Sequence, residues 1–306
     1  MSDRAGPVAV LANPTAGRGR YRGLLPEVVQ LLGTCGRPVT LLEAQTADEA
    51  EDACRRAVAE GAAALVAVGG DGTVHRALQA VAGTDVAFGV VPAGTGNDFA
   101  AELGLPAEAL AAAEALAGAL AGGRTRRVDL AELTGPAGER RWYGAVLAAG
   151  FDALVNERAN RMRWPRGERR YDIAILAELI RLRPRAYRIT VDGTVHEVEA
   201  LMVAVGNGAS YGGGMRITPT ADLTDGLLDI VVVGRISRLT FMRIKPRVYA
   251  GTHIEHPAAT VYRASTVEVA AEGITVYADG ERVCPLPVTV RCVPGALTVL
   301  GDAGQV

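Results

Sequence analysis

A buried strand, a glycine-rich turn and a helix follow one another over residues 63–81, and this order constrains the fold more than any other stretch of the chain. The apolar run at residues 63–68 (AALVAV) is typical of a strand in a parallel sheet, and the apolar spacing of residues 74–81 predicts a helix. The turn between them, residues 69–73, reads GGDGT. Glycines let a backbone approach a phosphate closely, and a helix start directs N–H groups toward an anion. The sequence therefore predicts a phosphate-binding turn.

Asp71 is the residue of this turn that phosphate binding alone does not explain. A carboxylate would repel a polyphosphate unless it holds a divalent cation or accepts a proton, and both are roles in phosphoryl transfer. The alternative is a helix N-cap, where Asp is preferred, although a cap does not need the three surrounding glycines. The turn fits neither the P-loop pattern nor the dinucleotide-binding pattern, so a different phosphate-binding scheme is expected.

The first 130 residues alternate between strands and helices. Strands are predicted at residues 7–12, 37–42, 63–68 and 86–91, and helices near 22–33, 47–60, 73–82 and 107–121. This alternation predicts an α/β domain whose parallel sheet is covered by helices on both faces. Ligands of such sheets bind at the carboxyl ends of the strands, where the loops at residues 13–20, 69–73 and 92–99 are expected.

From about residue 130 the pattern changes to period-two alternation, as in residues 188–198 with Asp192-Gly193 as a turn. Further strands are predicted at residues 198–206, 227–233, 258–271, 274–279, 286–293 and 296–300, and helices near 168–182 and 237–249. We therefore predict two domains. Residues 1–130 form the α/β parallel-sheet domain and residues 131–306 form an antiparallel β-sandwich.

Composition excludes several classes of protein. The net charge of −2 gives no field that favours nucleic acid, and the four cysteines contain no C-x-x-C pair that would indicate zinc. A strand that begins at Pro7 leaves no room for a signal peptide, and no long uncharged apolar run predicts a membrane span. These features predict a cytoplasmic globular protein.

Six motifs then occur in a recognisable order. They are NPTAGRGR at 13–20, GGDGTVHRAL at 69–78, PAGTGNDFA at 92–100, VDL at 128–130, TADLTDGLLDI at 220–230 and YADGE at 277–281. Together they resemble the diacylglycerol kinase catalytic family, which includes soluble bacterial lipid kinases and the sphingosine kinases. The resemblance implies an ATP- and Mg²⁺-dependent lipid kinase with an NAD-kinase/phosphofructokinase-like nucleotide-binding domain.

The resemblance also implies which residues contact ATP. These are Asn13, Pro14, Thr15, Ala16, Gly17, Thr46, Gly69, Gly70, Gly72, Thr73, Gly94, Thr95 and Asn97. Where related enzymes often carry lysine in the first loop, this chain has Arg18 and Arg20, which keep the charge. Thr46 also opens a T-x-x-E capping box, and that role alone would explain it. Thr95 and Asn97 have the alternative of a solvent-facing turn.

The acids of the motifs are candidates for the chemistry. The resemblance places Asp71, Asp98 and Asp129 near the transferred phosphoryl group, where they hold Mg²⁺ partly through water. Asp129 has the alternative of an ordinary residue at a strand edge. Glu281 is the candidate general base, coupled to Asp71. Its alternative is structural, because the preceding Asp-Gly pair is a strong hairpin-turn signal.

A second, structural Mg²⁺ is implied at the TADLTDGLLDI motif. Its ligands would be Asp222, Asp225, the carbonyl oxygen of Leu227 and water. As a bare sequence, an acidic turn without a metal explains the spacing equally well. Asn207 and the glycines at residues 212–214 form a further loop that we expect near the site.

The resemblance implies transfer of the ATP γ-phosphoryl group to a lipid hydroxyl, with diacylglycerol giving phosphatidic acid. A kinase of NAD or of a sugar phosphate, and a non-catalytic nucleotide- or lipid-binding regulator, are the alternatives. A lipid alcohol substrate requires transient peripheral binding at the inner face of the cell membrane. Residues 158–166 and 235–247 mix cations with apolar residues and are candidates for that contact. An exposed edge strand could also support a homodimer.

Overall fold

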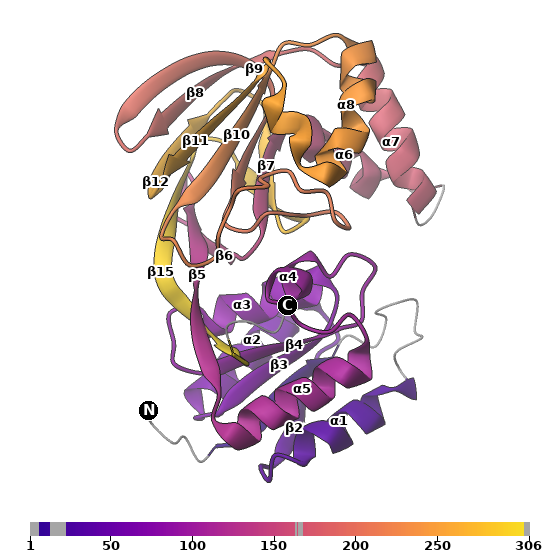
Figure 1. The fold of residues 1–306 in the computed structure, drawn as a ribbon, viewed down its shortest axis with the longest axis vertical. Helices are drawn as coiled ribbons and strands as arrows, with labels where there is room; N and C mark the ends of the chain where they lie inside the picture. The colour runs from indigo at the N-terminus through magenta and orange to yellow at the C-terminus, as the bar shows by residue number, and fades with distance from the viewer. Residues whose placement is uncertain (1–5, 13–22, 163, 165–167, 303–306) are drawn as a thin grey trace. The chain divides into compact units, whose positions relative to one another are not determined.

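A computed structural model describes residues 6–12, 23–162, 164 and 168–302 of the chain. It contains two compact units, shown in Figure 1. Unit 1 comprises Met1–Leu130 with Val293–Val306, and unit 2 comprises Ala131–Cys292. The chain passes between them twice, inside strand β5 (Thr125–Thr134) and strand β15 (Val288–Leu300). The prediction that the second domain extends to residue 306 is corrected here, because the end of β15 pairs with strand β4 of unit 1.

Unit 1 contains the parallel sheet that the sequence predicts. Its strands are β1 (Val8–Ala12), β2 (Val39–Leu42), β3 (Ala64–Gly69) and β4 (Ala87–Pro92). Their order is β2-β1-β3-β4, and the end of β15 joins β4 in parallel. The register pairs Gly69 with Pro92, so β3 and β4 end side by side. The turn at 69–73 and the loop at 92–98 are therefore neighbours.

Helices cover both faces of this sheet. They are α1 (Leu25–Gly33), α2 (Ala47–Ala59), α3 (Asp71–Val81), α4 (Asp98–Glu102) and α5 (Ala109–Gly122). Helices α1 and α5 bury apolar residues such as Leu32 and Leu116 against β1, β3 and β4. Figure 1 shows α2 and α3 behind the sheet when α1 and α5 are in front. The predicted α/β arrangement is confirmed.

Unit 2 is built from antiparallel strands. They are β6 (Arg140–Tyr143), β7 (Val146–Gly150), β8 (Arg185–Val191), β9 (Thr194–Gly206), β10 (Leu228–Gly234), β11 (Ala259–Ala264), β12 (Thr266–Ala270), β13 (Thr275–Ala278) and β14 (Glu281–Pro285), with parts of β5 and β15. The long strand β9 pairs with β7, β8 and β10, and the predicted hairpin at Asp192-Gly193 joins β8 to β9. The inward side chains form one large apolar core that includes Leu147, Ile189 and Val205.

In the described part of unit 2, three helices and one short turn of 3₁₀ helix interrupt these strands. They are α6 (Phe151–Arg161), α7 (Glu168–Ile180), α8 (Arg238–Ala250) and η2 (Thr252–Glu255). Helices α7 and α8 agree with the sequence prediction, whereas α6 was not predicted. Apolar residues of all three long helices pack into one cluster beside the sheet. In the described parts of the chain, no helix combines the length and the apolar character that crossing a membrane requires.

Candidate functional site

The two loops that follow β3 and β4 meet backbone to backbone. A Cβ atom added at Gly94 would lie 2.5 Å from the Cα of Gly70, and one added at Gly69 would lie 2.3 Å from Thr73 Oγ1. Non-bonded carbon and oxygen atoms do not approach that closely, so a side chain at either position would force its neighbour to move. The glycines predicted to let a phosphate approach therefore also let the two loops pack on each other.

Asp71 is the first residue of α3, and Gly70 is the N-cap. The N-cap interpretation of Asp71 is therefore wrong. Its Oδ2 accepts a hydrogen bond of 3.0 Å from the backbone N–H of Asn97. A Cβ at Gly96 would lie 2.5 Å from Asp71 Oδ2 and 3.2 Å from Asp98 Oδ2. The two carboxylates thus flank one glycine, and the structure brings together two of the three acids predicted near the phosphoryl group.

Asn97 shapes the second loop. It adopts a left-handed conformation, with φ of 60°. Its Oδ1 accepts the N–H of Gly94 at 2.9 Å, and its Nδ2 donates to the carbonyl oxygen of Gly94 at 3.1 Å. The side-chain amide therefore holds the loop that carries the exposed Thr95. Contact of Thr95 or Asn97 with a nucleotide stays a prediction.

Two other predicted residues have clear structural partners. The hydroxyl of Thr46 accepts the N–H of Glu49 at 3.2 Å, and the Glu49 carboxylate accepts the N–H of Gln45 at 2.8 Å. The Thr46 hydroxyl thus caps α2 as the T-x-x-E pattern predicts, whereas Glu49 reaches the residue before the N-cap rather than the N-cap itself. The buried Asp129 accepts the N–H of Gly295 at 2.7 Å and so ties β5 to β15. These contacts do not test the predicted ATP and Mg²⁺ roles, which stay predictions. Residues 13–17 lie outside the described part of the chain.

Glu281 is the first residue of β14 in unit 2 and is half-buried. Asp279 and Gly280 precede it with φ of 49° and 79°, so the hairpin turn predicted as the structural alternative is present. The Asp279 carboxylate accepts two backbone N–H groups, from Gly144 at 3.0 Å and Ala145 at 2.9 Å. The turn that carries Glu281 is therefore fixed from one side. The role of Glu281 as a base stays a prediction.

The other side of this hairpin is fixed by Glu157 of α6, which sequence reasoning did not identify. The Glu157 carboxylate accepts a hydrogen bond from the Tyr277 hydroxyl at 2.7 Å and from Arg282 Nε at 3.1 Å. The hydrogen bond from Tyr277 is the main cause of a lowered pKa of Glu157, although its partial burial opposes the shift. Burial raises the pKa of Tyr277 to about 12. The partners are more than 100 residues apart in sequence, so local pattern gave no signal.

Asn207 braces the segment that Asp279 holds. Its Nδ2 donates to the carbonyl oxygen of Gly144 at 2.9 Å, and its backbone N–H donates to the carbonyl oxygen of Ala145 at 2.9 Å. The side chain is buried. Each of the glycines at residues 212–214 has a positive φ, and the bridge between Tyr211 and Met215 closes their loop. Asn207 therefore supports the backbone opposite the Glu281 hairpin.

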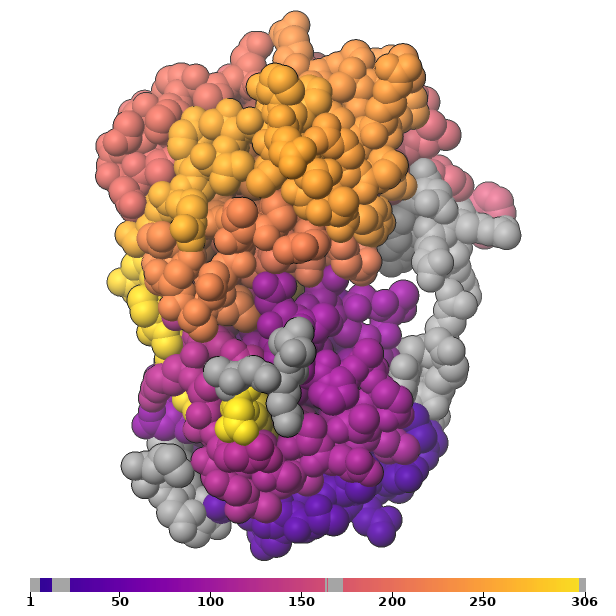
Figure 2. Space-filling view, in the orientation of Figure 1, coloured from indigo at the N-terminus to yellow at the C-terminus, as the bar shows by residue number. Residues whose placement is uncertain are grey.

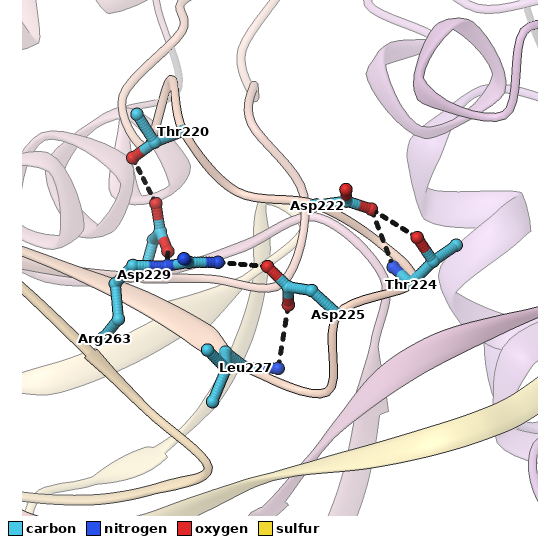
Figure 3. A network of polar contacts seen from close by, with 7 residues as sticks. All are labelled: Thr220, Asp222, Thr224, Asp225, Leu227, Asp229 and Arg263. Carbon is cyan, nitrogen blue, oxygen red and sulfur yellow. Dashed lines mark hydrogen bonds and ion pairs between the residues drawn. The ribbon is translucent and has the colours of Figure 1, made fainter.

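The acidic loop of unit 2 is neutralised by its neighbours (Figure 3). Arg263 forms an ion pair with Asp225 and donates from Nε to the buried Asp229 at 2.9 Å. Asp229 also bonds to the Thr220 hydroxyl, and Asp225 Oδ1 accepts the backbone N–H of Leu227 at 2.9 Å. The Arg263 guanidinium thus already supplies the positive charge beside Asp225 that a bound cation would otherwise supply.

The remaining acid of this loop faces its own backbone. Asp222 Oδ1 accepts the N–H of Thr224 at 2.9 Å and its hydroxyl at 2.7 Å. No cluster of three or more acid, histidine or cysteine side chains suited to a metal occurs among the described residues. The loop holds its shape through Arg263 and Thr224, so a fit to Mg²⁺ is not evident and that assignment stays a prediction.

Comparison with known proteins decides the family. Residues 7–133 match the diacylglycerol kinase catalytic domain, and residues 145–301 match the YegS C-terminal NAD kinase beta sandwich-like domain. A diacylglycerol kinase of Mycobacterium tuberculosis is 45% identical over 296 residues, which cover 96% of this chain and 95% of that protein. The chain belongs to the diacylglycerol kinase catalytic family. The resemblance stated from the six motifs is thereby confirmed.

Solved structures agree on the fold of this diacylglycerol kinase family member. A diacylglycerol kinase from Bacillus anthracis superposes with a TM-score of 0.73 at 23% identity, covering 98% of each chain. An NAD kinase from Archaeoglobus fulgidus in complex with ATP gives a TM-score of 0.52 at 14% identity, covering 96% of this chain and 93% of that one. These likenesses confirm the α/β plus β-sandwich fold. Membership of the family confirms the prediction of an ATP-dependent lipid kinase.

Proposed function

We propose that the protein transfers the γ-phosphoryl group of ATP to the hydroxyl of diacylglycerol and forms phosphatidic acid. The observation that carries this proposal is the pair of carboxylates, Asp71 and Asp98, that flank Gly96 between two glycine-packed loops. The 45% identity to a protein named diacylglycerol kinase supports this choice of lipid.

The residues of unit 1 suit the binding of a polyphosphate with a divalent cation. Turn 69–73 ends at the start of α3, where backbone N–H groups and the helix dipole favour an anion. Carboxylate oxygens are ligands that Mg²⁺ prefers, often through water. Asp71, Asp98 and Asp129 would hold the ion, partly through water. When bound, Mg²⁺ supplies neutralisation of the charge that develops on the phosphoryl oxygens.

Glu281 is the proposed proton acceptor for the lipid hydroxyl, with Asp71 coupled to it. Its support comes from its surroundings in unit 2. Asp279 and Glu157 fix the hairpin from both sides, and a general base requires a fixed position within hydrogen-bond reach of the proton it takes. A flexible loop would not serve this purpose as well.

The acceptor is dissolved in a bilayer, so the enzyme would bind transiently to the membrane surface that contains it. We propose the inner face of the cell membrane as that surface. The GGDGT turn alone would also fit a kinase of NAD or of a sugar phosphate. The test therefore includes these two substrates.

The test is phosphorylation by radiolabelled ATP with MgCl₂ of a lipid panel in mixed micelles, and of NAD and sugar phosphates in solution. We expect labelled phosphatidic acid with the wild type and none above background with Asp71→Ala. Equal melting temperatures for the two proteins would show that the variant folds. Label in NAD or a sugar phosphate, or full activity of Asp71→Ala, would contradict the proposal.

A further inference from the structure

Exposed large apolar side chains are concentrated on two helices of unit 2. Among the described residues they are Leu41, Trp164, Ile173, Leu176, Ile180, Val195, Leu239, Met242 and Tyr249. Three of the nine lie on α7 and three on α8. Single exposed apolar residues are ordinary, but a grouping of this kind marks an interaction surface.

Between Ile173 and Ile180, the exposed large side chains of α7 are apolar, and a charged side chain lies on the inward side. Ile173, Leu176 and Ile180 are 44%, 59% and 61% exposed and are spaced so that they share one face of the helix. Glu178 is instead mostly buried and accepts a hydrogen bond from Arg158 of α6 at 2.5 Å. A helix that only covered a protein core would bury its apolar residues and expose its charged residues.

The outward side of α8 combines apolar and basic residues. Leu239, Met242 and Tyr249 are exposed, and no acidic residue occurs between Arg238 and Ala250. Within the described parts of the chain, Arg238, Arg243 and Lys245 form no ion pair. Figure 2 shows the orange segment that includes α8 at the surface of unit 2.

Both helices rest on the same apolar cluster. Ala174 and Leu179 of α7 are buried in it, and Phe241 and Val248 of α8 pack against it. The centroid of the Phe241 ring lies 4.6 Å from the centroid of the Phe151 ring in α6. Other residues of α7 and α8 thus make the contacts with the apolar cluster, so the exposed apolar residues are available to a partner.

We propose that the outer faces of α7 and α8 together dock on a bilayer that contains anionic phospholipid. Apolar side chains that enter the interface, with cations beside them, are the combination that holds a protein on an anionic membrane surface. The inference rests on the proposed function, since it identifies where a lipid kinase meets its substrate. Of the other predicted segment, residues 158–166, Arg158 and Arg161 form ion pairs with Glu178 and Glu157, and Arg163 and Arg166 lie outside the described residues. The proposal therefore rests on the cations of α8, and a contact through residues 158–166 stays a prediction.

The apolar contribution is tested with Ile173→Gln/Leu176→Gln/Ile180→Gln in the full chain. The matched control is Leu41→Gln/Val195→Gln, which removes exposed apolar side chains elsewhere. Co-sedimentation with vesicles of phosphatidylglycerol and phosphatidylcholine measures binding. We expect the α7 variant to bind at least about tenfold more weakly than the wild type, and the control to bind within about twofold. Equal binding of the α7 variant and the control would overturn the proposal.

The basic contribution is tested with Arg238→Gln/Arg243→Gln/Lys245→Gln. Each cation near an anionic surface contributes about fivefold to binding, and added salt screens this contribution. We therefore expect a large loss at low salt and a weaker dependence of binding on NaCl than in the wild type. Arg56→Gln/Arg188→Gln is the control, because both of its arginines are exposed on other elements. An unchanged salt dependence in the α8 variant would contradict the role of these cations.

The remaining outcomes separate this proposal from the proposed function. Vesicle binding that depends on α7 and α8, in a protein that labels no lipid, would support the docking face and contradict diacylglycerol as substrate. Kinase activity on a water-soluble short-chain diacylglycerol is expected to stay within about threefold of wild type in both helix variants. A homodimer that the α7 variant dissociates, with vesicle binding unchanged, would overturn the proposal and assign the face to a second copy of the chain.

Discussion

The 69–73 turn of unit 1 and the 220–229 loop of unit 2 both contain aspartates but use their carboxylates in different ways. Asp71 of unit 1 accepts a hydrogen bond from the neutral N–H of Asn97, whereas Asp225 and Asp229 of unit 2 are paired with Arg263. A backbone N–H orients a carboxylate, whereas a guanidinium both orients it and neutralises its charge. The comparison teaches that acids grouped in sequence are not by themselves a metal site. The group they face decides their role.

The largest expected difference is between Asp71→Asn and Asp225→Asn. The first change removes the charge and the proton acceptance at the phosphate turn, so we expect kcat to fall by at least about 10³-fold. The second breaks an ion pair with Arg263, so we expect a lower melting temperature and a kcat within about threefold of wild type. Turnover of diacylglycerol in mixed micelles at saturating MgATP measures both. A loss of activity in Asp225→Asn with no loss of stability would contradict a purely structural role of this ion pair and would support the predicted Mg²⁺ at this loop.

Gly96→Ala tests the close approach of Asp71 and Asp98. The added methyl group would lie 2.5 Å from Asp71 Oδ2, so that carboxylate must move, and a displacement of about 1 Å costs about 100-fold in rate. Gly33→Ala is the control, since its nearest neighbouring atom would be 3.9 Å away. Steady-state kinetics of both variants measure the effect. If Gly96→Ala retained wild-type kcat/KM, the geometry around Gly96 would be irrelevant to catalysis.

Arg263→Gln tests how much the ion pairs of the unit 2 loop contribute to stability. Asp229 is 1% exposed and would lose its charged partner, so we expect the free energy of unfolding to fall by about 1–3 kcal/mol. Arg235→Gln is the matched control, because Arg235 and its partner Glu199 are both exposed and such pairs contribute less than about 1 kcal/mol. Urea denaturation measures both. Similar losses in the two variants would show that burial of Asp229 does not matter.

Asp152→Asn gives the smallest expected effect and depends on pH. Burial raises the pKa of the Asp152 carboxyl above its ordinary value of 3.8, while a hydrogen bond with Tyr211 opposes the shift. The folded state therefore holds this proton more tightly than the unfolded state, and stability falls as pH rises from about 4 through the folded pKa. The neutral amide has no such penalty. We expect equal melting temperatures near pH 4 and a gain of about 2–4 °C for the variant at pH 7. A constant difference across this range would contradict the ionisation of Asp152 as its cause.

Most elements of unit 1 could be predicted because their signals are local. A buried apolar run, a glycine turn and an apolar helix face identify β3 and α3 without any distant residue. Helix α6 escaped prediction although Phe151, Val155 and Ala159 are buried at helical spacing, since its polar residues obscure the pattern. The predicted break between residues 293 and 296 is absent. At that point Gly295 has a positive φ and donates to Asp129, so the strand bends and continues.

At residues 258–271 the prediction instead missed a break, because it gave one continuous strand. The segment is two strands, β11 and β12, with Ser265 between them. The Asp192 carboxylate accepts the hydroxyl of Ser265 at 3.1 Å and the N–H of Thr266 at 3.0 Å. The hydrogen bonds that mark the break thus come from a hairpin more than 70 residues away. No pattern within the strand itself contains that information.

The sequence by itself determined the family and the order of the elements in unit 1, because these depend on neighbours in the chain. Only the tertiary structure decided which acid faces a neutral N–H and which faces Arg263, and that the apolar residues of α7 point outward. Charge pairing and exposure depend on residues distant in sequence that folding brings within a few ångströms. The chemical role of an aspartate depends on these neighbours, and a sequence motif does not specify them.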